Sequence, residues 1–152
     1  MNNDSESDLT TPELRDLRCV AAMMVPASTE FDVPGADDAT IFADIVKSLG
    51  RDLRDVKAAI GTLATLGGCA FADLEASRRD AVAASFRERG GAEVAALSRA
   101  ILQCYYRDDR VVRSLGLEPR PPFPKGHTLE QGDWSLLDPV RKRPKMWRDA
   151  PP

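Results

Sequence analysis

Proline is concentrated at one end of this chain, in the last thirty-six residues from Leu117 to Pro152. Each proline fixes its own φ and removes a backbone donor, which interrupts helices and makes sheet pairing poor. Extended or polyproline-like backbone remains for such a segment. We therefore expect residues 117–152 to form a long irregular proline-rich extension, and the core to lie before it. The prolines of this segment are Pro119, Pro121, Pro122, Pro124, Pro139, Pro144, Pro151 and Pro152.

The extension is nevertheless rich in large apolar side chains, whereas disordered tails are usually poor in them. These side chains are Phe123, Leu129, Trp134, Leu136, Leu137, Val140, Met146 and Trp147. Two surfaces could bury them: the chain's own helical body, or a partner protein on which aromatic and arginine anchors supply much of the binding energy. A proline-rich backbone that is already extended loses little entropy on binding, and this favours burial of these side chains on a partner protein.

Apolar residues before the extension recur at helical spacing, and strand signals are weak. The pattern predicts helices near 11–25, 38–49, 51–66, 75–87 and 92–105, with a short sequel ending at Gly116. Only 6% of the chain is aromatic while 43% is hydrophobic, so the core should be aliphatic. We expect an all-α bundle of five to six helices over residues 10–116, preceded by a disordered N-terminus over residues 1–9.

Two local expectations follow from this pattern. Thr11 should cap the first helix, with Pro12 at its first helical position. The fourth helix should turn a stripe of four side chains inward. That stripe is Ala81, Val82, Ser85 and Phe86.

The net charge of −3 argues against a nucleic-acid surface, which needs a concentrated excess of lysine and arginine. The extension holds seven basic and five acidic residues, a net of +2, so the first 116 residues carry −5. Its basic run is either a solvated end or a surface that docks on an acidic partner. The run consists of Arg141, Lys142, Arg143, Lys145 and Arg148.

Cysteine usage and the start of the chain bear on location. Cys19, Cys69 and Cys104 are odd in number and far apart, so we expect reduced thiols, each buried as a small hydrophobe. The first ten residues have neither a secretory signal nor a twin-arginine pair, and no apolar run is long enough for a membrane span. These features predict a cytoplasmic protein with no membrane span.

Residues able to carry chemistry are few. His127 is the only histidine, and it lies on a segment with little to position a general base. Multi-histidine metal sites and glycine-rich phosphate cradles are missing from the sequence. Tyr105 and Tyr106 could stack on a flat ligand, although one facing the core is the commoner arrangement. We expect no catalytic residue, no metal and no cofactor in this chain.

Four short stretches carry a resemblance to a known family: Ala22-Met23-Met24-Val25-Pro26, Val33-Pro34-Gly35-Ala36, Phe71-Ala72-Asp73-Leu74 and Tyr105-Tyr106-Arg107-Asp108-Asp109-Arg110-Val111-Val112. Together they resemble the gluconate 2-dehydrogenase subunit 3 family over roughly residues 10–140. Members are small helical subunits of bacterial flavoprotein dehydrogenases. The resemblance implies that FAD and the catalytic groups belong to a large partner subunit of the glucose/methanol/choline (GMC) oxidoreductase class, sometimes joined by a cytochrome subunit or another electron acceptor.

The implied role is to bind, stabilise and help mature such an alcohol or sugar dehydrogenase. Many members of the family carry a twin-arginine export signal, so co-export with a signal-bearing partner to the periplasm is the alternative location. We expect the extension to bind the partner through Arg120, Pro121, Pro122, Phe123, Pro124, His127, Trp134, Leu137 and Trp147.

Two other classes of function remain open from the sequence. One is a free-standing helical interaction or regulatory module with no flavoprotein partner. The other is an enzyme or small-ligand binder that uses Tyr105, Tyr106, His127 or a cysteine.

Overall fold

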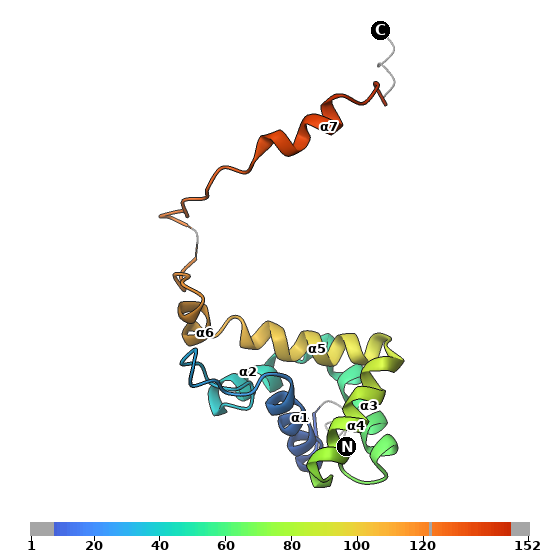
Figure 1. Cartoon of the computed structure of the whole chain (residues 1–152). Helices are drawn as coiled ribbons and strands as arrows, with labels where there is room; N and C mark the ends of the chain where they lie inside the picture. The colour runs from blue at the N-terminus through green and yellow to red at the C-terminus, as the bar shows by residue number, and fades with distance from the viewer. Residues whose placement is uncertain (1–7, 122, 147–152) are drawn as a thin grey trace, which may run out of the picture. The chain divides into compact units, whose positions relative to one another are not determined.

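Helices make up the regular structure of the computed structural model, which describes residues 8–121 and 123–146 (Figure 1). No strand occurs among these residues, so the all-α prediction is confirmed. The chain divides into two compact units between Pro119 and Arg120, and each is described by itself. The first unit contains α1 (Thr11–Met24), α2 (Ala39–Ser48), the 3₁₀ helix η1 (Gly50–Asp52), α3 (Leu53–Gly67), the 3₁₀ helix η2 (Phe71–Asp73), α4 (Ala76–Arg89), α5 (Ala92–Tyr105) and α6 (Asp109–Ser114).

The second unit contains the 3₁₀ helix η3 (Trp134–Leu137) and α7 (Asp138–Arg141). The sequence predicts that prolines interrupt helices throughout this segment, but two short helical turns form there. Pro139 lies in the first turn of α7, where a backbone N–H has no helical acceptor and a proline costs nothing. Of the predicted disordered segment 1–9, residues 1–7 lie outside the described residues. Leu9 packs, half-buried, against the core.

The first helix begins one residue earlier than predicted, because Thr10 caps it in place of Thr11. The Thr10 hydroxyl accepts a hydrogen bond from the Glu13 N–H at 3.4 Å, and the Glu13 carboxylate accepts one from the Thr10 N–H at 2.7 Å. This reciprocal capping box needs Thr and Glu three residues apart, and Thr10, unlike Thr11, has that spacing. At the end of α3, Gly68 adopts φ 80°, a left-handed conformation in which a helix commonly ends.

The centre of the first unit is α3, which packs against α1, α4 and α5 as well as η1 and η2. Its inward face consists of Val56, Ala59, Ile60 and Leu63, at three- and four-residue steps. Among the described residues, every buried hydrophobic side chain lies between Leu17 and Val111. The core is therefore complete within the first unit and is mainly aliphatic, as the composition predicts.

The inward stripe of α4 is narrower than predicted. Val82 and Phe86 are buried, but Ala81 and Ser85 are exposed, and the Ser85 hydroxyl donates to the Ala81 carbonyl at 3.0 Å. The reason is that α4 packs mainly on α3 and α5, and Val82 and Phe86, one turn apart, account for its buried face.

A buried carboxylate joins α1 to η2. Asp16, only 4% exposed, accepts a hydrogen bond from the Ala72 N–H at 2.8 Å. From the other side, the Arg79 guanidinium of α4 donates to the carbonyls of Ala72 at 3.2 Å and Leu74 at 2.8 Å. These hydrogen bonds satisfy backbone groups of the segment from Ala72 to Leu74, and they fix the positions of α1 and α4 relative to it.

Three arginine–aspartate pairs join two segments of the chain. One runs from Asp38 to Asp52 and contains α2, and the other runs from Arg99 to Arg110 and contains the end of α5 and the start of α6. The closest N–O distances are 2.7 Å for Arg99 with Asp52, Arg107 with Asp44 and Arg110 with Asp38. Residue numbers rise along one side of this ladder and fall along the other, as an antiparallel arrangement requires. Each pair is partly exposed and so contributes little alone, but the two-pronged guanidinium geometry specifies the register of the helices.

We predict that Leu63→Ala will lower the free energy of unfolding by about 2–5 kcal/mol, because it leaves a cavity on the central helix. Urea unfolding followed by circular dichroism measures this loss. Leu115→Ala is the matched control, since Leu115 is 56% exposed and its truncation should change stability by no more than about 0.5 kcal/mol. Equal effects of the two substitutions would contradict the placement of α3.

Asp38 generates a pH-dependent prediction. The hydrogen bonds from Arg110 lower the pKa of the Asp38 carboxyl below its ordinary value. Its contribution to stability is therefore present above the unfolded pKa of about 3.9 and is lost as pH falls through the lower folded pKa.

We expect Asp38→Asn, which keeps a good helix cap, to reduce the unfolding free energy by up to about 1 kcal/mol at neutral pH. The difference from wild type should shrink in strong acid. Parallel denaturant titrations at neutral and strongly acidic pH test this, with Asp80→Asn as the control. A deficit that does not change with pH would refute the assignment.

Candidate functional site

The described residues of the second unit expose large apolar side chains and form no buried core. Every described residue from 123 to 146 is exposed. Phe123 is 84% exposed and Trp134 is 61% exposed. The other large apolar side chains exposed there are Leu129, Leu136, Leu137, Val140 and Met146. A surface of this composition, rimmed by charged residues, is typical of a segment that binds another macromolecule.

One cluster of predicted binding residues lies in a loop closed by Arg120. The Arg120 guanidinium donates to the Gly126 carbonyl at 2.6 Å and to the Pro121 carbonyl at 3.3 Å, and lies 3.5 Å from Nδ1 of His127. This turn presents Phe123 and Pro124, joined by a cis peptide bond. Pro122, also predicted to bind, lies outside the described residues.

The second cluster is η3, which carries Trp134 and Leu137. Residues three apart on a 3₁₀ helix lie on the same side, so the two side chains share one face. Asp133 caps this helix: its carboxylate accepts hydrogen bonds from the Ser135 hydroxyl at 2.6 Å and the Ser135 N–H at 3.0 Å, which lower the pKa of Asp133. The Trp134 indole N–H donates to the Gln131 side chain at 3.4 Å.

The structure therefore brings the predicted residues together as two clusters, the Arg120–His127 loop and η3. Trp147, the last residue of the predicted set, lies outside the described residues. The cap and the indole hydrogen bond give η3 a defined local shape although it has no core. Sequence analysis identified the apolar side chains but not this helical turn.

Within the described residues, His127 has one hydrogen-bonding contact. It is exposed, and its hydrogen-bonding contact among the described residues is the Arg120 guanidinium. A base in an acid–base or nucleophilic arrangement is held by an acceptor and faces a nucleophile. Neither kind of group contacts this ring in the described part of the chain.

The two tyrosines divide as the sequence suggested. Tyr105 is 4% exposed and Tyr106 is 55% exposed, with their rings in an edge-to-face contact at 5.2 Å. Burial raises the pKa of the Tyr105 hydroxyl. Because Tyr105 is buried, only the Tyr106 ring is exposed. The two rings therefore cannot stack on both sides of a flat ligand.

The cysteines do not all behave as buried hydrophobes. Cys104 is buried and Cys19 is half-buried, but Cys69 is exposed, which corrects the prediction for that residue. Its position just after the helix-ending Gly68 explains the exposure, because the chain turns outward there. Burial raises the pKa of both the Cys19 and the Cys104 thiols.

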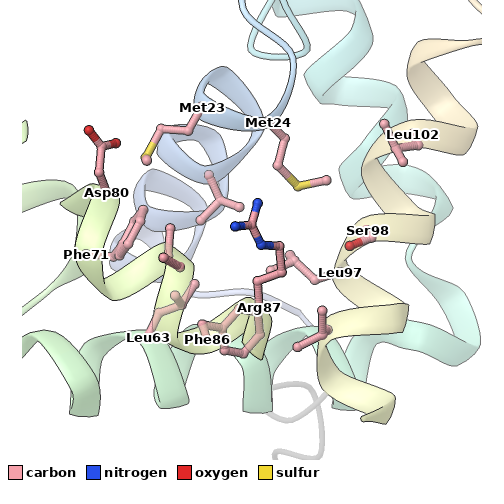
Figure 2. Close-up of a pocket in the computed structure, with 14 residues that line it drawn as sticks. Met23, Met24, Leu63, Phe71, Asp80, Phe86, Arg87, Leu97, Ser98 and Leu102 are labelled. Carbon is pink, nitrogen blue, oxygen red and sulfur yellow. The ribbon is translucent and has the colours of Figure 1, made fainter. Parts of the chain in front are cut away.

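A hollow that sequence analysis missed lies in the first unit, where residues of α1, α3, η2, α4 and α5 line it (Figure 2). Its volume is about 520 Å³. Core side chains form its floor, and polar groups are few. The lining residues are Val20, Met23, Met24, Leu63, Phe71, Asp80, Ala83, Ala84, Phe86, Arg87, Val94, Leu97, Ser98 and Leu102. We call this hollow the α1/α4 groove.

No single stretch of sequence could have indicated the α1/α4 groove, because residues from Val20 to Leu102, on α1, α3, η2, α4 and α5, line it together. The one partial signal is the consecutive pair Met23 and Met24 at the end of α1. Met24 is 37% exposed although it is apolar, and it lies beside the partly buried Met23.

Among the described residues, no cluster of histidine, cysteine, aspartate and glutamate is suited to holding a metal ion. The same part of the chain contains no helix long and apolar enough to cross a membrane. Comparisons with protein-family models, curated proteins and solved structures give no match. The resemblance to the gluconate 2-dehydrogenase subunit 3 family therefore stays a prediction from the sequence.

The exposure of the thiols generates a chemical prediction. In the native full-length chain, one thiol should react rapidly with a maleimide, and mass mapping should identify it as Cys69. Cys69→Ser should abolish this fast phase, whereas Cys104→Ser should leave it unchanged. A fast phase that survives Cys69→Ser would contradict the placement of the three cysteines.

Proposed function

We propose that this chain is a non-catalytic small subunit that binds, stabilises and helps mature a large FAD-dependent dehydrogenase of the GMC class. The observation that carries the proposal is the second unit, whose apolar side chains around Phe123 and Trp134 are exposed and have no core of their own. The identity of the partner rests on the sequence resemblance. FAD and the reacting groups would belong to that partner, with alcohols or sugars as substrates.

Trp134 is the strongest single anchor in the proposal. Covering an aromatic side chain of roughly 200 Å² stabilises a complex by several kcal/mol at about 25 cal/mol per Å². Part of that gain is offset by the entropy lost when the segment orders on its partner. The Asp133 cap already holds the η3 turn, which reduces this cost.

A small helical body with an anchoring extension suits a stabilising subunit. The first unit has its own complete core, so it can fold before it meets the partner. The extension can then cover apolar surface on a large apoprotein during maturation. The net positive charge of the extension, beside a negative first unit, favours an acidic patch on the partner.

The exposed second unit also supports the alternative of a free-standing interaction module. The two proposals differ in one measurable property, the presence of flavin in the purified complex. Co-expression of this chain with the product of a neighbouring gene for a large FAD-binding oxidoreductase decides between them. A yellow complex with a flavin spectrum supports the subunit proposal, and a colourless complex with another protein supports the module.

We predict that Trp134→Ala in the full-length chain will weaken binding to the large flavoprotein by about 2 kcal/mol or more, roughly 30-fold. The physical reason is the loss of a desolvated aromatic anchor. Titration calorimetry or a surface-binding assay measures the dissociation constant. Tyr106→Ala, at a similarly exposed aromatic outside the second unit, is the control. Wild-type affinity of Trp134→Ala would remove the anchor from the proposal.

We further predict that a chain ending at residue 119 keeps the helical circular dichroism and cooperative unfolding of the first unit. All described buried hydrophobic side chains lie before that point, which is why the core should survive. Co-purification of the flavoprotein should be lost at the same time. A truncated chain that still retains its partner at full yield would rule out the extension as the main anchor.

A further inference from the structure

The α1/α4 groove has a floor that is itself the hydrophobic core. Leu63 and Phe71 are 1% exposed and Leu97 is 2% exposed, yet all three line the hollow. Helices α1, α4 and α5 pack on α3, and the groove is the space that they leave open between them. An occupant must therefore present apolar groups to the bottom of the groove.

The edge of the groove is adaptable. Met23 and Met24 come from α1 and Leu102 from α5, and Figure 2 shows them on opposite sides of the opening. Met24 is 37% exposed and Leu102 is 36% exposed. Unbranched thioether side chains adjust to irregular apolar surfaces, and for that reason they are common where a helix docks.

Two opposite charges mark the α4 side of the groove. Asp80 and Arg87 both line it and lie seven residues apart, about 10 Å along the helix axis. Neither side chain makes a hydrogen bond or an ion pair with another described residue. Arg99, Arg107 and Arg110 each pair with an aspartate. The Arg87 guanidinium instead extends over the groove (Figure 2).

This charge pattern selects one kind of occupant. A helix laid along α4 repeats the same spacing, because its residues i and i+7 lie on one face about 10 Å apart. An acidic residue of that helix would meet Arg87 and a basic one would meet Asp80, with apolar residues between them on the groove floor. Both charges are exposed, and a ligand shorter than about 10 Å would reach only one of them.

We propose that the α1/α4 groove binds an amphipathic helix of the partner protein, with its acidic end at Arg87 and its basic end at Asp80. The inference rests on the proposed function, in which that partner is the large flavoprotein subunit. It adds a second contact surface, formed by α1, α4 and α5, to the one on the second unit. It also specifies the polarity of charge that the partner helix must carry.

The test uses the full-length chain and the co-expressed large flavoprotein, with affinity measured in low salt. Arg87→Glu and Met24→Lys should each weaken binding at least about tenfold, because one reverses a charge and the other places a charge on the apolar edge. Arg89→Glu is the matched control on the same helix, outside the groove lining, and should change affinity less than about twofold. Both altered residues are exposed, and circular dichroism checks that the fold is kept.

A photoreactive benzophenone side chain at position 102 identifies the occupant. Cross-links to a helical segment of the flavoprotein with an acidic and a basic residue seven positions apart would support the proposal. Unchanged affinity of both Arg87→Glu and Met24→Lys would overturn it. So would a small molecule that native mass measurement finds on the isolated wild-type chain but not on Arg87→Glu.

The outcomes also separate this inference from the proposed function. If the wild-type chain binds no flavoprotein, both fall together. If the wild-type chain binds and both groove variants bind equally well, the groove inference alone fails.

Discussion

Burial of the α3 face holds the first unit together. Val56, Ala59, Ile60 and Leu63 lie on one side of this helix, and α1, α4 and α5 each cover part of it. The buried face of α5 is the other extended apolar surface of this unit, and it packs on α2, α3 and α4. The groove is the space left open where α1, α4 and α5 meet this face.

Sequence periodicity was sufficient to predict the helices because each has an apolar stripe and a recognisable stop, such as Gly68 after α3. It could not predict stripe width, which depends on the neighbours, so Ala81 and Ser85 were placed inward wrongly. The Arg–Asp ladder was also missed, since its partners are 47 to 72 residues apart. Pairings at that separation are set by tertiary packing and leave no local signal.

In the candidate site, too, composition could be read from the sequence but local and tertiary geometry could not. The apolar content of the extension is readable from composition, but the η3 turn with Trp134 and Leu137 on one face depends on the hydrogen bonds of Asp133. The groove was beyond sequence reasoning, because residues of α1, α3, α4 and α5 form it together. In our proposals the two surfaces have complementary roles: one supplies aromatic anchors, the other orientation through charge. Contacts on one chain reinforce each other when both engage the same partner.

The hydrogen bonds around η2 connect the groove wall to the backbone. Asp16 of α1 and Arg79 of α4 both hydrogen-bond to the short stretch from Ala72 to Leu74. This stretch therefore links two of the helices that line the groove. Separation of α1 from the bundle would expose a carboxylate and an amide at once. We therefore expect α1 and η2 to open together, with the Ala72 amide exchanging with solvent only when both open.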